Sequence, residues 1–277
     1  MTRLLFAAML MVIHSSAVAR ELTPLLVDGF AEFGPEVSRA EACNRALSSA
    51  KQNALRKRYG EEVGQKSILT CDEKLEKQSG NNCELFENTW SLLNTNGFIR
   101  SVKKVDERVD EKIGMSICKV TANVFIEEYE GSPDYSFETR LTVKQGNNLR
   151  LNDKPIIEIE SNKPAFHYVY YWAPFVDSDY YYQLFPNAYD QQKETAKQLR
   201  IPTGQATKNY SFEVSLPDDM SYSHEYLIVI SSKKPLASPP EKITEVNFFR
   251  WLKSFDRKQW TQSTFNYRVL GDSAWQT

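Results

Sequence analysis

Hydrophobic and polar residues alternate at every second position over residues 118–126. The apolar positions are Cys118, Val120, Ala122, Val124 and Ile126. A period of two is typical of a β-strand with one buried face, so we predict a strand over Ile113–Glu127 with its even positions inward. The polar turn Asp110–Lys112 connects it to a predicted partner strand, Phe98–Glu107. Leu25–Phe33 is predicted as the first strand of the same small sheet.

A helical period replaces this alternation after the first strand. Small and apolar residues form one stripe at i, i+3, i+4, i+7 and i+11: Cys43, Ala46, Leu47, Ala50 and Ala54. Ser38 and Glu41 match the S-x-x-E capping box at its start, and Gly60 lies where the helix should end. Because the stripe consists mostly of small residues, the helix backbone can approach a sheet closely. A second helical period follows at Phe86, Trp90 and Leu93.

Aromatic residues are concentrated in the middle of the chain. Between Phe166 and Phe185, ten of twenty residues are Phe, Tyr or Trp. Both arms show a period of two around Asp177–Asp179, which predicts a β-hairpin with its turn at these residues. One face of such a hairpin must be buried, which assigns about half of the rings to the core. Tyr171 and Tyr181 are the candidates for the outward-facing, ligand-binding minority.

The remaining elements predict an α+β fold. Strands are expected over Phe137–Lys144, Leu149–Leu151 and Ile156–Glu160. An amphipathic helix over Glu245–Phe255 and a last strand over Trp260–Leu270 should close the core. Charge, Gly and Pro accumulate over residues 127–136. We therefore predict a helix-on-antiparallel-sheet domain over residues 20–130 and a mainly-β domain, sandwich or barrel-like, over residues 131–277.

The first residues have the pattern of an export signal. Arg3 precedes the apolar run Leu4–Ile13, and Ala17–Ala19 forms a small-x-small cleavage site. The run spans roughly half of the ~20 residues that cross a bilayer, so we predict a signal peptide over residues 1–19, cleaved after Ala19. An uncleaved anchor is the alternative. The mature protein is expected to be soluble, without a transmembrane segment, and exported to a bacterial periplasm.

Charge and cysteine content agree with export. The chain has 34 Lys and Arg against 36 Asp and Glu, a balance that argues against nucleic acid or a membrane surface as partner. Its four cysteines permit three pairings. Cys71 and Cys83 bracket a polar stretch and should close a local loop, while Cys43 and Cys118 lie on predicted core faces and should pair with each other. Free buried thiols are the alternative.

Catalytic motifs are sparse in this sequence. The predicted mature chain has two histidines, His167 and His224, and it lacks G-x-S-x-G, H-E-x-x-H, paired C-x-x-C and Gly-rich phosphate-loop motifs. Asp177 and Asp179 form a weak calcium candidate, and a plain turn is the preferred interpretation. We therefore predict no catalytic residues, no metal and no cofactor.

The first half of the chain resembles the N-terminal domain of flagellar assembly protein T and the related lipoprotein-20 domains. The resemblance spans Val27–Ile126 and rests on the strand residues Asp28–Phe30, the helix RAEACNRALSSAKQNAL, the strand GFIRSV and the alternating strand. It implies a role in envelope or flagellar-basal-body assembly without enzymatic activity. The lipid-attachment cysteine of the lipoprotein relatives is missing, and the Cys71–Cys83 loop is an addition.

The second half resembles a β-rich module classified as domain of unknown function 4384. The match covers Phe166–Leu236, and its most specific parts are the motif LFPN and the later Ile201-Pro202. Family members usually carry Gly in the turn where this chain has Asp177–Asp179. The module accompanies other domains, which implies binding or structural support.

Three functional hypotheses follow. The first is a noncatalytic periplasmic interaction or assembly protein that contacts another envelope protein. The second is a carbohydrate- or peptidoglycan-binding module that uses Tyr171 and Tyr181. The third and most remote is a hydrolase in the second domain.

Overall fold

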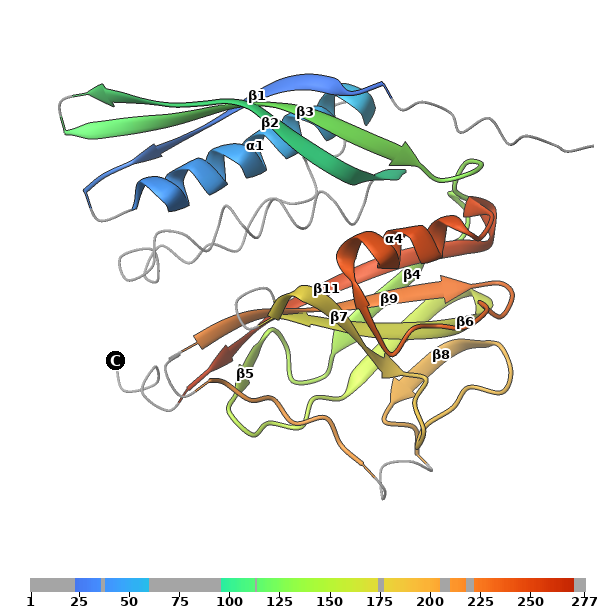
Figure 1. The fold of residues 1–277 in the computed structure, drawn as a ribbon. Helices are drawn as coiled ribbons and strands as arrows, with labels where there is room; N and C mark the ends of the chain where they lie inside the picture. Colours follow the sequence, from blue (N-terminus) through green and yellow to red (C-terminus); the bar gives the residue numbers. More distant parts are fainter. Residues whose placement is uncertain are drawn as a thin grey trace, which may run out of the picture.

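The computed structural model contains two antiparallel or mixed sheets, each covered by one helix (Figure 1). It describes residues 23–35, 38–59, 96–112, 114–173, 177–204, 210–217 and 222–271. The predicted leader with its cleavage site at Ala19, the Cys71–Cys83 bridge, Gly60 and the second helical segment lie outside the described residues.

The N-terminal sheet has the strand order β1-β3-β2, and all its pairings are antiparallel. It comprises β1 (Leu25–Phe33), β2 (Gly97–Lys112) and β3 (Met115–Glu128), with helix α1 (Arg39–Tyr59) against one face. The first strand is confirmed with its predicted bounds. The predicted turn at Asp110–Lys112 is wrong, because these residues extend β2 and pair with β3. The chain turns instead around Gly114, whose φ of 81° lies in the left-handed region that favours glycine.

Helix α1 packs closely on β1, as its small-residue stripe predicts. Ala46, Ala50 and Ala54 have no exposed surface. A Cβ atom added at Gly29 would lie 2.1 Å from the carbonyl oxygen of Ala46, so the strand backbone lies directly against the helix backbone. A disulfide joins Cys43 of α1 to Cys118 of β3, with 5.2 Å between the Cα atoms, as predicted.

The second sheet has the order β10-β7-β6-β9-β11-β5, and its ends do not meet. Its strands are β4 (Thr139–Val143), β5 (Asn148–Arg150), β6 (Ile157–Ala173), β7 (Asp177–Phe185), β8 (Ala196–Ile201), β9 (Tyr222–Ser232), β10 (Lys242–Thr244) and β11 (Trp260–Leu270). Strands β4 and β8 pair only with the first part of β6, while β7 and β9 pair with its second part. The two strands predicted on either side of residue 161 are therefore one long strand shared by two ladders. The peptide bonds Phe185–Pro186 and Ile201–Pro202, which follow β7 and β8, are cis.

Each face of the aromatic hairpin contributes residues to a buried cluster, which corrects the expectation that only one face is buried. Tyr168, Tyr170 and Trp172 belong to a cluster that helix α4 (Glu245–Lys253) completes with Phe248, Phe249 and Leu252. Val169 and Phe185 belong to a cluster on the opposite face, with residues of β4, β5 and β8. The second part of the chain is thus a sandwich-like core, and its closing helix and last strand agree with the predicted α4 and β11.

The two sheets share part of their core at the junction (Figure 1). The ring of Phe98 on β2 lies 5.6 Å from that of Phe249 on α4, and Tyr129 lies 5.1 Å from Trp260. An ion pair between Lys253 and Glu127 spans the same junction. The fold is therefore α+β, as predicted from the sequence. In the described part of the chain, no helix has the length and apolarity needed to span a bilayer.

Candidate functional site

Tyr181 does not face solvent, so the prediction of an outward-facing ring at this position is wrong. Only 1% of its surface is exposed, and its ring lies 4.9 Å from that of Phe248 on α4. The sequence could not show this, because helix α4, more than sixty positions later, covers the face on which Tyr181 lies.

Tyr171, the other candidate, is half-buried on the opposite face of the sheet. Its hydroxyl is directed at the carboxyl group of Glu225, which Tyr267 also approaches from β11. Burial raises the pKa of Glu225, and the hydrogen bonds from Tyr267 and Tyr171 offset this only in part. Tyr171 is therefore engaged with a buried acid, and only part of its surface remains available to a ligand.

The partly exposed tyrosines of the hairpin are the neighbours of Tyr181 rather than Tyr181 itself. Tyr180 and Tyr182 lie on the opposite side of β7, and Tyr182 pairs with Tyr171 across the sheet. The pairing of β6 with β7 is irregular at two places, between Val169 and Tyr170 and between Tyr171 and Ala173. At such an irregularity, an extra residue changes which side chains of the two strands lie on the same face of the sheet. The alternation within each strand does not reveal this change.

Asp177 is the first residue of β7, so the turn predicted at Asp177–Asp179 does not lie there. The Asp177 carboxylate accepts a hydrogen bond from the Tyr182 hydroxyl and lies 3.8 Å from Nζ of Lys242. Among the described residues, no cluster of three or more His, Cys, Asp or Glu side chains has a geometry that would hold a metal ion.

His167 belongs to a buried chain of hydrogen bonds. Its Nε2 lies 3.1 Å from the carbonyl oxygen of Ala196, and its Nδ1 lies 2.8 Å from Oγ of Ser231. A carbonyl only accepts, so Nε2 carries the proton and Nδ1 accepts from the Ser231 hydroxyl. Ser231 in turn lies 2.7 Å from Oγ1 of Thr139. Burial lowers the pKa of His167, which favours this neutral state.

This Ser–His pair differs from a hydrolase pair in its surroundings. Ser231 has no exposed surface, so a substrate cannot reach its hydroxyl in this conformation. In a triad, Nε2 of the histidine faces the serine and Nδ1 donates to an orienting carboxylate, whereas in this chain Nδ1 faces Ser231 and Nε2 donates to a backbone carbonyl. His224, predicted in a turn, lies within β9, and burial lowers its pKa to about 4.

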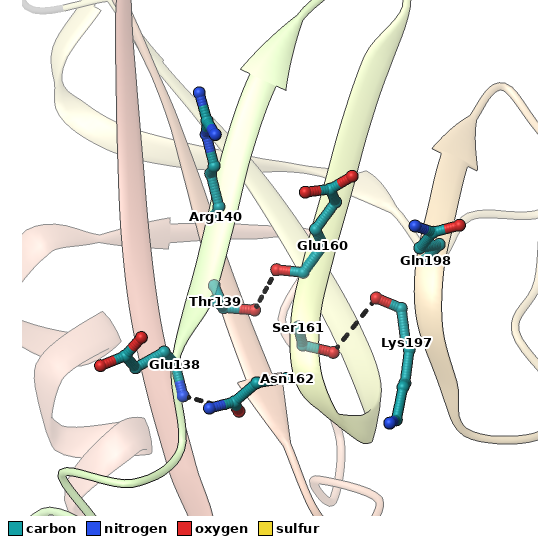
Figure 2. Close-up of a pocket in the computed structure, with 8 residues that line it drawn as sticks. All are labelled: Glu138, Thr139, Arg140, Glu160, Ser161, Asn162, Lys197 and Gln198. Atoms are coloured by element: carbon teal, nitrogen blue, oxygen red, sulfur yellow. Dashed lines mark hydrogen bonds between the residues drawn. The ribbon is translucent and has the colours of Figure 1, made fainter.

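A depression of about 610 Å³ lies between β4, β6 and β8 (Figure 2). Thr139, which is hydrogen-bonded to Ser231, is one of the residues that line it. The depression forms because four residues of β6, 161–164, lie opposite the single residue Lys197 of β8. Hydroxyl and amide groups at its floor bond to the protein backbone: Ser161 donates to the carbonyl of Lys163 at 2.7 Å, and the Asn162 amide donates to that of Ser136 at 3.0 Å. The charged side chains of Glu138 and Arg140 point away from each other (Figure 2). The depression thus follows from the strand bulge, and its polar groups do not converge on one point.

The N-terminal sheet carries the largest exposed apolar side chains of any described strand. Leu26 is 56% exposed and Phe30 is 63% exposed, and both lie on β1. Odd-numbered residues of β1 face α1, as the close approach of Gly29 shows, so the even-numbered ones lie on the other face. Figure 1 shows α1 on one face of this sheet and no labelled element on the other.

A scan against models of protein families finds no match to the chain, and neither does a search of curated proteins. The two family resemblances noted in the sequence therefore remain predictions.

Proposed function

We propose that the chain is a noncatalytic, exported interaction or assembly protein of the bacterial cell envelope. Its binding surface is the face of the N-terminal sheet that carries Leu26 and Phe30, and its partner is another envelope protein with a complementary apolar surface. One observation carries the proposal: two large apolar side chains are more than half exposed on the same face of one strand.

The surroundings of these two residues support a role as a protein interface. Leu26 pairs with Asn123 and Phe30 with Lys119 on β3, and between them the Asp28 carboxylate accepts a hydrogen bond of 2.6 Å from Thr121. An apolar centre with a polar rim is the usual anatomy of a binding patch. More than half of each side chain is exposed, and a partner with an apolar surface would bury this area.

The two edge strands of the same sheet, β1 and β2, differ in how well each could pair with a strand of another protein. Strand β2 has register shifts at Ile99/Ser101 and Lys104/Asp106 and carries a dense run of charges, both of which protect an edge. Strand β1 pairs with β3 without interruption over nine residues. The Asn53 side chain donates a hydrogen bond of 2.8 Å to one carbonyl of β1, that of Asp28. We infer that a partner strand aligns beside β1 and packs on Phe30.

Export is part of the proposal. The leader pattern of residues 1–19 supports it, and so does the Cys43–Cys118 disulfide, since disulfides persist in oxidising compartments. The buried Ser231–His167 pair offers no support for the hydrolase alternative. Tyr181 lies in the core, so it is not available to bind a glycan as the second hypothesis requires.

Site-specific photo-crosslinking in the producing cell tests the surface. A photoreactive residue at position 30 should give one adduct of defined mass with a second protein, and Leu26→Asp should abolish that adduct. The same photoreactive residue at Tyr189, which is 67% exposed on the other part of the chain, serves as the matched control and should give none.

The outcome against the proposal is equally defined. If the photoreactive residue gave adducts with the same proteins at positions 30 and 189, the proposal that β1 carries the binding surface would be wrong. If the protein co-sedimented with isolated cell wall and Phe30→Asp did not reduce this co-sedimentation, the result would favour the glycan-binding alternative instead.

A further inference from the structure

Lys242 of β10 is held between two tyrosine rings of the neighbouring strand. Its Nζ lies 4.0 Å from the ring centroid of Tyr180 and 4.8 Å from that of Tyr182. The Asp177 carboxylate, 3.8 Å away, completes the surroundings and also accepts a hydrogen bond from the Tyr182 hydroxyl. Two aromatic faces and one carboxylate thus converge on a single ammonium group.

The pairing of β7 with β10 creates this arrangement. Lys242 pairs with Tyr182 and Thr244 pairs with Tyr180 in an antiparallel register. Tyr180 and Tyr182 lie on one side of β7, since the residue between them, Tyr181, is buried on the other. A hydrogen bond with the Tyr182 hydroxyl is the main reason why the pKa of Lys242 is raised. The side chains of Lys242 and Asp177 keep 49% and 36% of their surface exposed, so small molecules can reach the group.

Aromatic faces beside a carboxylate are the standard receptor for an organic ammonium group. Lys242 comes from a strand of only three paired residues at the end of the sheet, which is a weak tether. We propose that Tyr180, Tyr182 and Asp177 form a binding site for an alkylammonium group, such as the lysine side chain of a partner protein, with Lys242 as its internal competitor. The site lies in the second sheet and does not depend on the β1 surface proposed above.

Competition by Lys242 makes the proposal testable in an unusual direction. An internal group that occupies a site about nine-tenths of the time weakens an external ligand about tenfold. Removing the Lys242 ammonium should therefore strengthen binding rather than weaken it. Lys242→Met keeps the apolar stem and removes only the charge.

The experiment is an NMR titration of the full chain with Nα-acetyl-lysine methylamide, followed through the amide signals of β7. We expect Lys242→Met to bind the probe about tenfold more tightly than the original chain. In that background, Tyr180→Leu or Asp177→Asn should weaken binding about fivefold. Nα-acetyl-norleucine methylamide, which lacks the charge, should not bind.

Lys154→Met is the matched control variant. Lys154 is also an exposed lysine beside a carboxylate, 4.0 Å from Glu213. Its loss should leave the affinity for the probe unchanged. The proposal is overturned if Lys242→Met binds no more tightly than the original chain, if Lys154→Met has the same effect, or if Tyr180→Leu, shown to be folded by its circular dichroism, retains full affinity.

Discussion

The Nδ1 atom of His167 lies 2.8 Å from Oγ of Ser231, and both residues are almost completely buried. This contact joins β6 to β9 behind the floor of the depression, with Thr139 of β4 as its next member. Three strands of the second sheet therefore meet at one hydrogen-bonded chain. Its members are a histidine and two hydroxyl groups, yet its burial makes it a structural element of the core.

Ser231→Ala should lower the free energy of unfolding by about 1–3 kcal/mol. The substitution leaves Nδ1 of His167 without its partner in a buried place, and an unsatisfied buried polar group costs about this much. Ser232→Ala is the control, because Ser232 is equally buried but makes only a 3.4 Å contact with the carbonyl of Gln259. Urea denaturation measures both. Equal effects of the two substitutions would contradict a special role for the Ser231–His167 contact.

The contribution of the two histidines to stability should fall as the pH drops below about 6.5. Burial lowers the pKa of His167, and it lowers that of His224 to about 4. Each unfolded histidine binds a proton near pH 6.5, whereas the folded one resists it, so acid favours the unfolded chain. The histidine contribution is fully present above about pH 6.5 and is lost as the pH falls towards the folded pKa values.

Denaturation at several pH values, with His224→Gln compared with the original chain at each pH, isolates this contribution. The comparison is needed because burial raises the pKa of Glu225 and Glu245, which lowers stability as the pH rises above about 4.5. A His224→Gln variant with the same slope as the original chain between pH 6.5 and 5 would refute the assignment for His224.

Gly29→Ala should destabilise the N-terminal part by about 3 kcal/mol or more, since overpacking against rigid neighbours is costly. The added methyl group would lie 2.1 Å from the carbonyl oxygen of Ala46 and 2.3 Å from the backbone nitrogen of Ala50, and neither can move without shifting α1. Gly34→Ala is the matched control, because nothing lies within 4 Å of its Cβ position. Thermal unfolding should show a large loss for the first variant and almost none for the second.

Tyr181→Phe should raise the free energy of unfolding by about 1 kcal/mol. The Tyr181 hydroxyl is buried and has no hydrogen-bond partner among the described residues, so its removal relieves a desolvation cost. Tyr181→Ala should instead lose about 3–5 kcal/mol, as expected when a large aromatic core residue is truncated. If Tyr181→Phe were clearly destabilising and weakened binding to isolated cell wall, the buried placement of this ring would be wrong.

Local patterns in the sequence were enough to predict several elements with their bounds or nearly so. Strands β1 and β11 agree with the prediction at both ends, and α4 begins at the predicted Glu245. The alternation of β3 and the small-residue stripe of α1 also predicted the disulfide, because they placed Cys43 and Cys118 on facing buried surfaces. Each of these depends on a periodicity or a pair of faces that neighbouring residues establish by themselves.

The candidate binding residues could not be chosen in this way. Alternation divided each arm of the aromatic hairpin into two faces, but it could not relate the faces of one arm to those of the other or say which face solvent reaches. The tertiary structure decided that Tyr181 is buried and that Tyr180 and Tyr182 contact Lys242, because α4 covers one face of the sheet and β10 pairs with the edge of β7. Local periodicity records that two faces differ, whereas exposure depends on segments that return from elsewhere in the chain.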